Sequence, residues 1–145
     1  MNLRIPGPTP VPPEVLEAMA KQMINHRGPE FAEILAGVTA RLKRLFKTEN
    51  DMFIVTGSGT GVMEAAVVNF FSPGDKVLVV YIGAFGDRFV AIAKAFGADV
   101  HRLDFPWDSA ADPDAVDAAL KSDPSIKAVL VTHNETSTGV TNDLA

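Results

Sequence analysis

Apolar residues recur along the chain with two different spacings. Between Pro29 and Phe46 they return every three or four positions, which is the period of an amphipathic helix. A shorter helix is predicted from Pro13, with its apolar face formed by Val15 or Leu16, Met19 and Met23. Residues 25–28 break the pattern between the two helices. Residues 1–13 are rich in proline, which predicts an extended arm that cannot form a regular helix.

From residue 52 onward, continuous apolar runs alternate with helical periods. Short apolar runs between turns are typical of strands that are buried on both sides in a parallel sheet. The predicted strands are residues 52–55, 76–81, 99–103 and 127–132. The predicted helices are residues 61–71, 85–96 and 113–121. This alternation predicts an α/β fold, a three-layer α/β/α arrangement in which helices cover both faces of a mainly parallel sheet.

The glycine-rich turn at residues 57–61 is the strongest chemical signal. Its three glycines let the backbone turn sharply and approach a ligand, and Ser58 and Thr60 add hydroxyls. The helix that follows offers free amides and a favourable dipole to an anion, so the turn predicts a phosphate cradle. The alternative is a tight strand–helix turn without a ligand. A P-loop is disfavoured because no lysine lies between Lys47 and Lys76, and a dinucleotide site is disfavoured because position 62 is valine.

Composition narrows the classes of partner. The chain has 145 residues, a formal net charge of −5 and no cysteine. A negative charge argues against a nucleic-acid surface, and the lack of cysteine excludes disulfides and thiolate chemistry. No apolar run is long enough to span a membrane, and no metal-ligand spacing occurs. We therefore expect one cytoplasmic domain that binds no nucleic acid, no membrane and no metal.

Four segments, taken in order, resemble the class V aminotransferases, fold-type I enzymes that use pyridoxal 5′-phosphate (PLP). The closest likeness is to the alanine–glyoxylate and serine–glyoxylate aminotransferase group. The segments are residues 6–10, 25–31, 57–65 and 132–139, with support from residues 83–88. Each is short, but together they span nearly the whole chain in the family's order.

The resemblance assigns roles to six positions. A phosphate-binding loop, a ring-stacking aromatic and a hydroxyl near the cofactor's phenolic oxygen would form the cofactor site, and one backbone position would lie near the substrate carboxylate. In that order, the matching residues are Ser58, Gly59 and Thr60, then Phe85, then Thr136, and finally Gly7.

The residues alone leave alternatives open at several of these positions. Phe85 also begins an apolar stripe that is typical of core packing, and Thr136 could simply form a turn. Glu135 lies near the expected site, but a solvated or turn-bonding carboxylate is at least as good an interpretation. His26 and His133 have no recognisable acid–base partner, so a hydrogen-bonding loop role is favoured for both.

The family's Schiff-base lysine has no match among the lysines of this chain. In relatives, that lysine follows the segment that matches residues 132–139. We therefore expect the N-terminal part of a PLP-dependent transferase large domain. Residues 1–28 would form an arm and helix, and residues 29–145 a partial PLP-binding domain truncated before the lysine. The chain alone would hold no catalytic residue and would be inactive.

The function implied by the resemblance is transfer of an amino group from alanine or serine to glyoxylate by the full-length enzyme. Its partners would be a small amino acid, a 2-oxo acid and a second copy of the chain in a homodimer. Two alternatives remain. One is another class V enzyme, such as a phosphonate transaminase, a desulfurase-like enzyme or a lyase. The other is a non-catalytic, truncated domain that binds phosphate.

Overall fold

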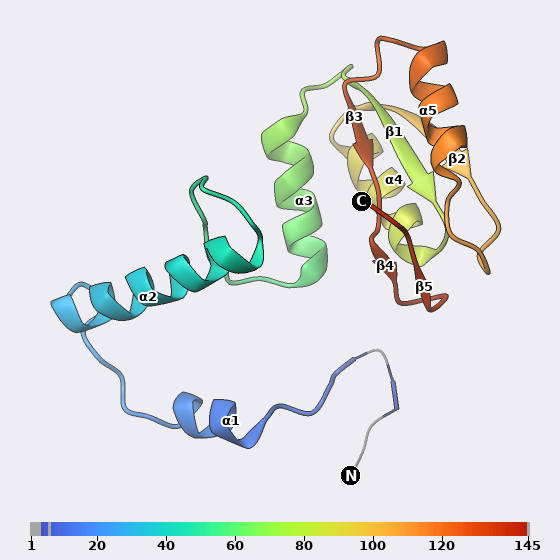
Figure 1. The fold of residues 1–145 in the computed structure, drawn as a ribbon. Helices are drawn as coiled ribbons and strands as arrows, with labels where there is room; N and C mark the ends of the chain where they lie inside the picture. Colours follow the sequence, from blue (N-terminus) through green and yellow to red (C-terminus); the bar gives the residue numbers. More distant parts are fainter. Residues whose placement is uncertain (1–3, 6, 145) are drawn as a thin grey trace. The chain divides into compact units, whose positions relative to one another are not determined.

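The chain divides into two compact units, Met1–Thr56 and Gly57–Ala145. The computed structural model describes residues 4–5 and 7–144 (Figure 1). The domain boundary predicted after residue 28 falls within the first unit, between its two helices, and it stays a prediction.

In the first unit, helices α1 (Pro13–Met19) and α2 (Pro29–Leu45) both begin at a proline. Proline suits the first turn of a helix because the amide it lacks would have no partner there. The turn between them forms as predicted, since Asn25 Oδ1 accepts a hydrogen bond from Arg27 N at 3.0 Å. The predicted face of α1 is too long, because the helix ends at Met19 and Met23 lies beyond it.

The strand predicted at residues 52–55 is wrong. This segment has no regular structure, and the side chains of Phe53 and Val55 are 83% and 63% exposed. A strand exists only by pairing with another strand, and no described strand pairs with this run. Its apolar residues resemble those of a buried strand, but in the described structure they pair with no strand and stay largely exposed.

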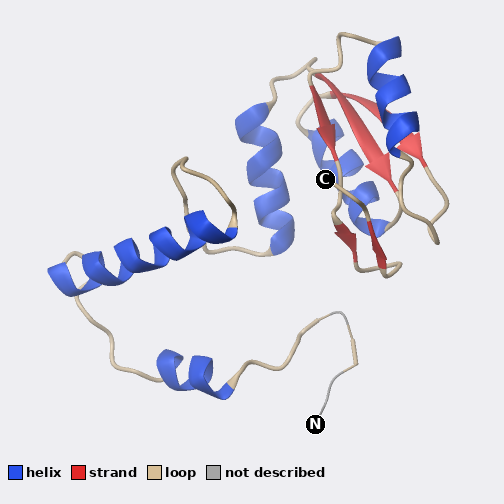
Figure 2. Cartoon of the chain, viewed as in Figure 1, coloured by secondary structure: helices blue, strands red, loops and turns tan. Residues whose placement is uncertain are grey.

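A parallel three-stranded sheet forms the centre of the second unit (Figure 2). Strand β1 (Lys76–Tyr81) lies between β2 (Asp99–Asp104) and β3 (Ala128–Leu130). These three strands confirm the sequence prediction, although β3 is shorter than the predicted run. The apolar run of β1 is buried at its four central positions, as expected for the middle strand of a covered sheet.

Helices cover both faces of this sheet (Figures 1 and 2). Val67 of α3 (Gly59–Phe70), Val77 of β1 and Ala93 of α4 (Ala84–Ala95) form the buried core on one face. Alternate side chains of a strand point to opposite faces, so Val80 points away from this core. There it faces α5 (Pro113–Ser122) across a small cavity. The α/β/α layering predicted from the sequence is confirmed.

Local signals end and begin the helices as predicted. Gly97 has a φ of 81° just after α4, in the left-handed region that favours glycine at a helix end. Asp112 precedes α5, and its side chain accepts a hydrogen bond from Asp114 N at 3.0 Å. These caps explain why the helix limits could be found from the sequence alone.

The segment that follows β3 is fixed at the carboxyl edge of the sheet. It forms a short antiparallel hairpin of β4 (Asn134–Glu135) and β5 (Val140–Thr141). Asn142 is 3% exposed; its Nδ2 donates to Thr132 O at 2.7 Å, and its Oδ1 accepts from Ala111 N at 2.8 Å. Asn142 therefore ties the hairpin to the end of β3 and to the loop before α5.

Two ion pairs lie at the opposite, amino edge of the sheet. Lys76 Nζ is 2.7 Å from Asp123 Oδ2, and Lys127 Nζ is 2.6 Å from Asp75 Oδ2. The hydrogen bonds from Lys76 and from Ser125 hold the pKa of Asp123 well below its usual range. The glycine-rich turn lies at the opposite, carboxyl edge of the sheet (Figure 1). Substitutions near these ion pairs can therefore serve as controls for substitutions in the turn.

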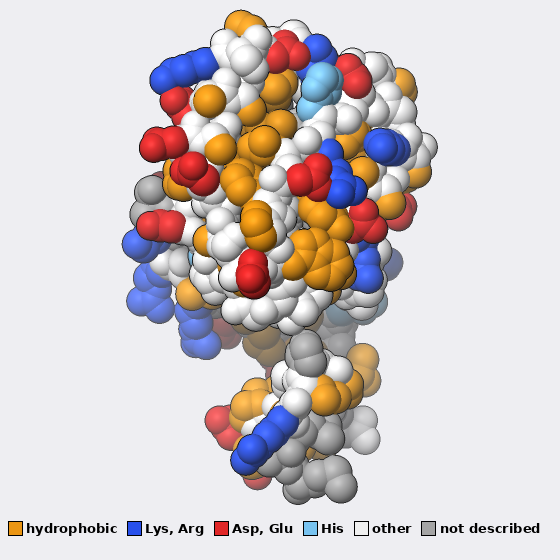
Figure 3. Space-filling model, turned by 90° about the vertical axis from the view of Figure 1, so that its right-hand side faces the viewer, with side chains coloured by type: hydrophobic (Ala, Val, Ile, Leu, Met, Phe, Trp, Pro, Cys, Tyr) orange, Lys and Arg blue, Asp and Glu red, His pale blue; other side chains and the backbone are white. Residues whose placement is uncertain are grey.

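The described surface carries mixed charge. Figure 3 shows one face of the molecule, on which acidic and basic side chains are interspersed with apolar ones. None of the described helices is both long and apolar enough to cross a membrane. The expected lack of nucleic-acid partners and the expected cytoplasmic location stay predictions.

Candidate functional site

The N-terminus of α3 is capped but open. Ser58 precedes the helix with an extended backbone, and its Oγ accepts a hydrogen bond from Gly61 N at 3.1 Å. Within the described chain, the amides of Gly59 and Thr60 have no hydrogen-bond partner. First-turn amides point out of the helix end, where the backbone dipoles give a partial positive charge. This end of α3 is therefore built to receive an anion.

Arg88 of α4 joins this turn to the start of the next helix. Its Nη1 donates to Thr60 Oγ1 at 2.7 Å, and its guanidinium carbon lies 4.9 Å from the centre of the Phe85 ring. The arginine thus links Thr60 and Phe85, two of the predicted cofactor residues, although they are far apart in the sequence. Thr60 Oγ1 already accepts from Arg88, which leaves its hydroxyl proton to be donated elsewhere.

Glu135 occupies the N-terminus of α4 with its own carboxylate. Oε2 accepts from Phe85 N at 3.0 Å and from Gly86 N at 3.3 Å, while Oε1 accepts from Ser137 Oγ at 2.6 Å. The Ser137 hydroxyl in turn accepts from Ala84 N at 3.0 Å. The Glu135 side chain is completely buried, so these donors replace water around its charge. The solvated interpretation of Glu135 is wrong, because α4 and the hairpin enclose it. The turn-bonding interpretation is confirmed, since Oε1 accepts from both the amide and the hydroxyl of Ser137 in the same turn.

Gly83 makes this close approach possible. A Cβ atom at this position would lie 2.5 Å from Cγ of Glu135 and 2.7 Å from Ser137 Oγ. Both distances are shorter than any real contact of a Cβ atom. The backbone of Gly83 is extended, so space rather than conformation requires a glycine here.

The structure brings the predicted cofactor residues to one edge of the second unit. Arg88 connects the turn that holds Ser58, Gly59 and Thr60 to Phe85. The fifth residue, Thr136, lies in sequence between Glu135 and Ser137, which both bond to the turn that begins α4. The sixth predicted residue, Gly7, belongs to the arm of the first unit, and its place relative to this site stays a prediction.

Phe85 does not behave as a simple core residue. Phe85, Phe89 and Ile92 are all half-buried, but only Phe89 and Ile92 pack against the described core cluster of Val67, Val77 and Ala93. The ring of Phe85 contacts the guanidinium of Arg88. This placement favours a role at the surface of the site, and stacking on the cofactor stays a prediction.

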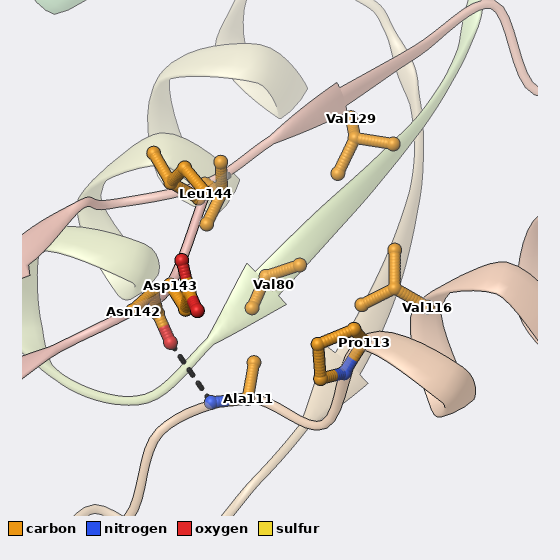
Figure 4. A pocket seen from close by; sticks show the side chains of 9 residues that line it. Val80, Ala111, Pro113, Val116, Val129, Asn142, Asp143 and Leu144 are labelled. Atoms are coloured by element: carbon orange, nitrogen blue, oxygen red, sulfur yellow. Dashed lines mark hydrogen bonds between the residues drawn. The ribbon is translucent and has the colours of Figure 1, made fainter.

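A cavity lies elsewhere in the unit (Figure 4). It measures about 170 Å³ and lies between the sheet and α5, with a lining that includes Val80, Val116, Val129 and Leu144. None of the predicted site residues lines it. A mostly aliphatic lining suits no phosphate, because such a group needs several hydrogen-bond donors. We therefore place the candidate site at the open helix end rather than in this cavity.

Comparison with known proteins decides the family. The family model described as aminotransferase class-V matches residues 1–145. The chain belongs to the class-V aminotransferase family.

Two relatives and one solved structure show how far this similarity extends. An uncharacterized aminotransferase of Methanocaldococcus jannaschii is 49% identical over 98% of this chain and 37% of its own length. A serine–glyoxylate aminotransferase of Methylorubrum extorquens is 38% identical over 99% of this chain and 36% of its own length. The crystal structure of an alanine–glyoxylate aminotransferase from Nostoc sp. matches with a TM-score of 0.90 at 35% identity, covering 97% of this chain and 37% of that one. The chain thus spans well under half the length of these class-V aminotransferases.

Class-V aminotransferases are PLP-dependent, and the residues present fit that cofactor's phosphate. A phosphate requires donors, and the open end of α3 offers the amides of Gly59 and Thr60. The hydroxyls of Ser58 and Thr60 already act as acceptors within the protein, so each can donate its proton outward. Phe85 adds an aromatic face beside these donors.

The sequence analysis gave Arg88 no role of its own in this candidate site and left the role of Glu135 open. Arg88 was noted only as part of a supporting segment, although a basic residue three positions after an aromatic on a helix was a usable signal for their contact. Glu135 could have been found from Gly83, since a glycine at a strand end and a carboxylate after the neighbouring strand meet at the same sheet edge.

Proposed function

We propose that the protein is a PLP-dependent aminotransferase that transfers an amino group from alanine or serine to glyoxylate. One observation carries the proposal: the open N-terminus of α3 presents two amides and two outward-donating hydroxyls. The relatives named as serine–glyoxylate and alanine–glyoxylate aminotransferases support the choice of donor and acceptor.

In this proposal the chain binds and orients the cofactor. The amides of Gly59 and Thr60 hold the phosphate, and the hydroxyls of Ser58 and Thr60 complete its donor set. Phe85 offers a flat face that fixes the tilt of the pyridine ring, and Thr136 donates toward the cofactor's phenolic oxygen. Bound PLP supplies an electron sink for the α-carbon of the amino acid.

The amino-acid carboxylate and the second subunit involve the first unit of the chain. Gly7 would offer a backbone amide to the carboxylate of the substrate. The described residues of the proline-rich arm are exposed and contribute no buried side chain, which supports a place for the arm against a second copy of the chain in a homodimer.

The proposal is tested by cofactor binding and by amino transfer. PLP is titrated into the whole protein that carries this chain, and glycine formation from glyoxylate is measured with alanine and then with serine as donor. We expect PLP binding and transfer from at least one of the two donors. PLP binding without transfer from either donor would favour another class V reaction, and an absence of PLP binding would refute the proposal.

A matched pair of variants ties the result to the site. Thr60→Val removes one hydroxyl of the open helix end without changing the side-chain shape, and Ser125→Ala removes a hydroxyl at the amino edge of the sheet. We expect Thr60→Val to weaken PLP binding about tenfold and Ser125→Ala to leave it unchanged. Equal PLP affinity in both variants would show that the cofactor binds elsewhere.

A further inference from the structure

Two arginines of the second unit are described with the guanidinium over an aromatic ring, Arg88 and Arg102, and they differ in whether a carboxylate pairs with the guanidinium. Arg102 lies 3.8 Å above the Tyr81 ring and is neutralised by Asp104, whose Oδ1 accepts from its Nε at 2.7 Å. Arg88 also lies over an aromatic ring, but among the described residues it contacts no carboxylate. The positive charge of Arg88 is therefore left unbalanced beside the open end of α3.

The contact with Thr60 fixes the direction of a hydrogen bond. Arginine is only a donor, so its 2.7 Å bond to Thr60 Oγ1 uses the hydroxyl as an acceptor. The hydroxyl proton must then point to another acceptor, and none is present among the described residues. An ion of opposite charge with acceptor oxygens would satisfy both the proton and the guanidinium.

The ring of Phe85 holds the guanidinium in this position. A cation within about 6 Å of a ring centre is attracted by its π-face, and here the separation is 4.9 Å. Two separate contacts, one to α3 and one to the Phe85 ring, thus define where the charge of Arg88 lies.

We propose that Arg88 is a positioning residue of the phosphate site, which holds the Thr60 hydroxyl as a donor and brings the positive charge that a dianionic phosphate requires. This inference rests on the proposed PLP-dependent function. It explains why the site needs no lysine in the glycine-rich turn, since the cation comes from α4 instead.

The first test compares two cofactor forms in matched variants. PLP and pyridoxal, which lacks the phosphate, are titrated into the whole protein, its Arg88→Gln variant and its Arg102→Gln variant. We expect Arg88→Gln to weaken PLP binding about tenfold, as for loss of one charge-assisted hydrogen bond, and to leave pyridoxal binding unchanged. Arg102→Gln removes an equal charge and should change neither. Inorganic phosphate, used as a competitor of PLP, should also compete less well in Arg88→Gln.

The second test asks whether Arg88 acts through Thr60. In a Thr60→Val background, Arg88→Gln should lower PLP affinity by clearly less than it does in the parent protein, because part of its effect is already lost. Full additivity of the two losses would overturn the positioning role.

Other outcomes also decide the matter. Equal losses for PLP and pyridoxal in Arg88→Gln would mean that the arginine only supports the fold. Unchanged PLP affinity in Arg88→Gln, with normal binding by the parent protein, would refute the inference and leave the proposed function standing. A parent protein that binds neither PLP nor phosphate would refute both.

Discussion

Replacing Glu135 by glutamine should destabilise the second unit strongly, although the two side chains have the same shape. The carboxylate accepts from two amides of α4 through Oε2 and from Ser137 through Oε1. Glutamine has one acceptor oxygen and one NH₂ group, so one of these sets of donors must face another donor. The cheaper arrangement turns the NH₂ group toward Ser137, whose hydroxyl can rotate to accept, while the Ser137 amide loses its acceptor.

The magnitude follows from what this arrangement loses. Hydrogen bonds to a charged group contribute about 1.5–3 kcal/mol each, against about 1 kcal/mol for neutral ones. A buried negative charge at a helix N-terminus adds about 1–2 kcal/mol. Summed over the two amide bonds and the helix end, Glu135→Gln should lower the free energy of unfolding by about 2–6 kcal/mol.

Urea unfolding followed by circular dichroism measures this loss. Glu64→Gln is the matched control, because Glu64 is exposed on α3, and it should change the free energy of unfolding by less than about 0.5 kcal/mol. If Glu135→Gln proved as mild as the control, the carboxylate could not be an ionised acceptor of these four bonds, and the reasoning would fail.

Three further outcomes follow from the same structure. Gly83→Ala should lower the free energy of unfolding by about 1–3 kcal/mol in urea melts, because its methyl group would overlap Glu135; an unchanged midpoint would contradict that contact. Phe85→Ala should weaken PLP binding by about 1–2 kcal/mol if the ring stacks on the cofactor, whereas unchanged affinity with a loss of about 3–5 kcal/mol of stability would show a core role instead. Lys76 lowers the pKa of Asp123, so the stability contributed by this carboxylate is present above about pH 4 and is lost as pH falls through the lowered pKa. Asp123→Asn should therefore flatten the loss of stability below about pH 4 in urea melts run at several pH values, and an unchanged acid limb would argue against the ion pair.

The sequence predicted those features that depend on neighbouring residues. Pro29 and Asp112 mark helix starts, Gly97 marks a helix end, and the apolar run of β1 marks the central strand, because each signal acts within a few positions. The run at residues 52–55 carries similar letters but forms no strand, since pairing depends on what lies beside it.

The same distinction applies to the candidate site. The capping role of Ser58 and the open amides could be expected from the glycine-rich turn itself, since the bond to Gly61 spans three residues. The contact of Arg88 with Thr60 spans 28 residues, and that of Glu135 with Phe85 N spans 50. No local pattern specifies these two hydrogen bonds, so the long-range partners of Arg88 and Glu135 became visible only in the folded chain.

The carboxylate of Glu135 also has a consequence for stoichiometry. Helices α3, α4 and α5 all begin at the carboxyl edge of the sheet (Figure 1), where a helix end can in principle attract an anion. Asp112 caps α5 with its own carboxylate, which leaves α3 and α4 to compare. Because the chain fills the end of α4 with a side chain of its own, the second unit should bind one phosphate rather than two. Shortening the side chain of Glu135 would then leave the amides at the N-terminus of α4 free to bind a small anion. Inorganic phosphate would bind there as a second ligand, as well as competing with PLP at α3.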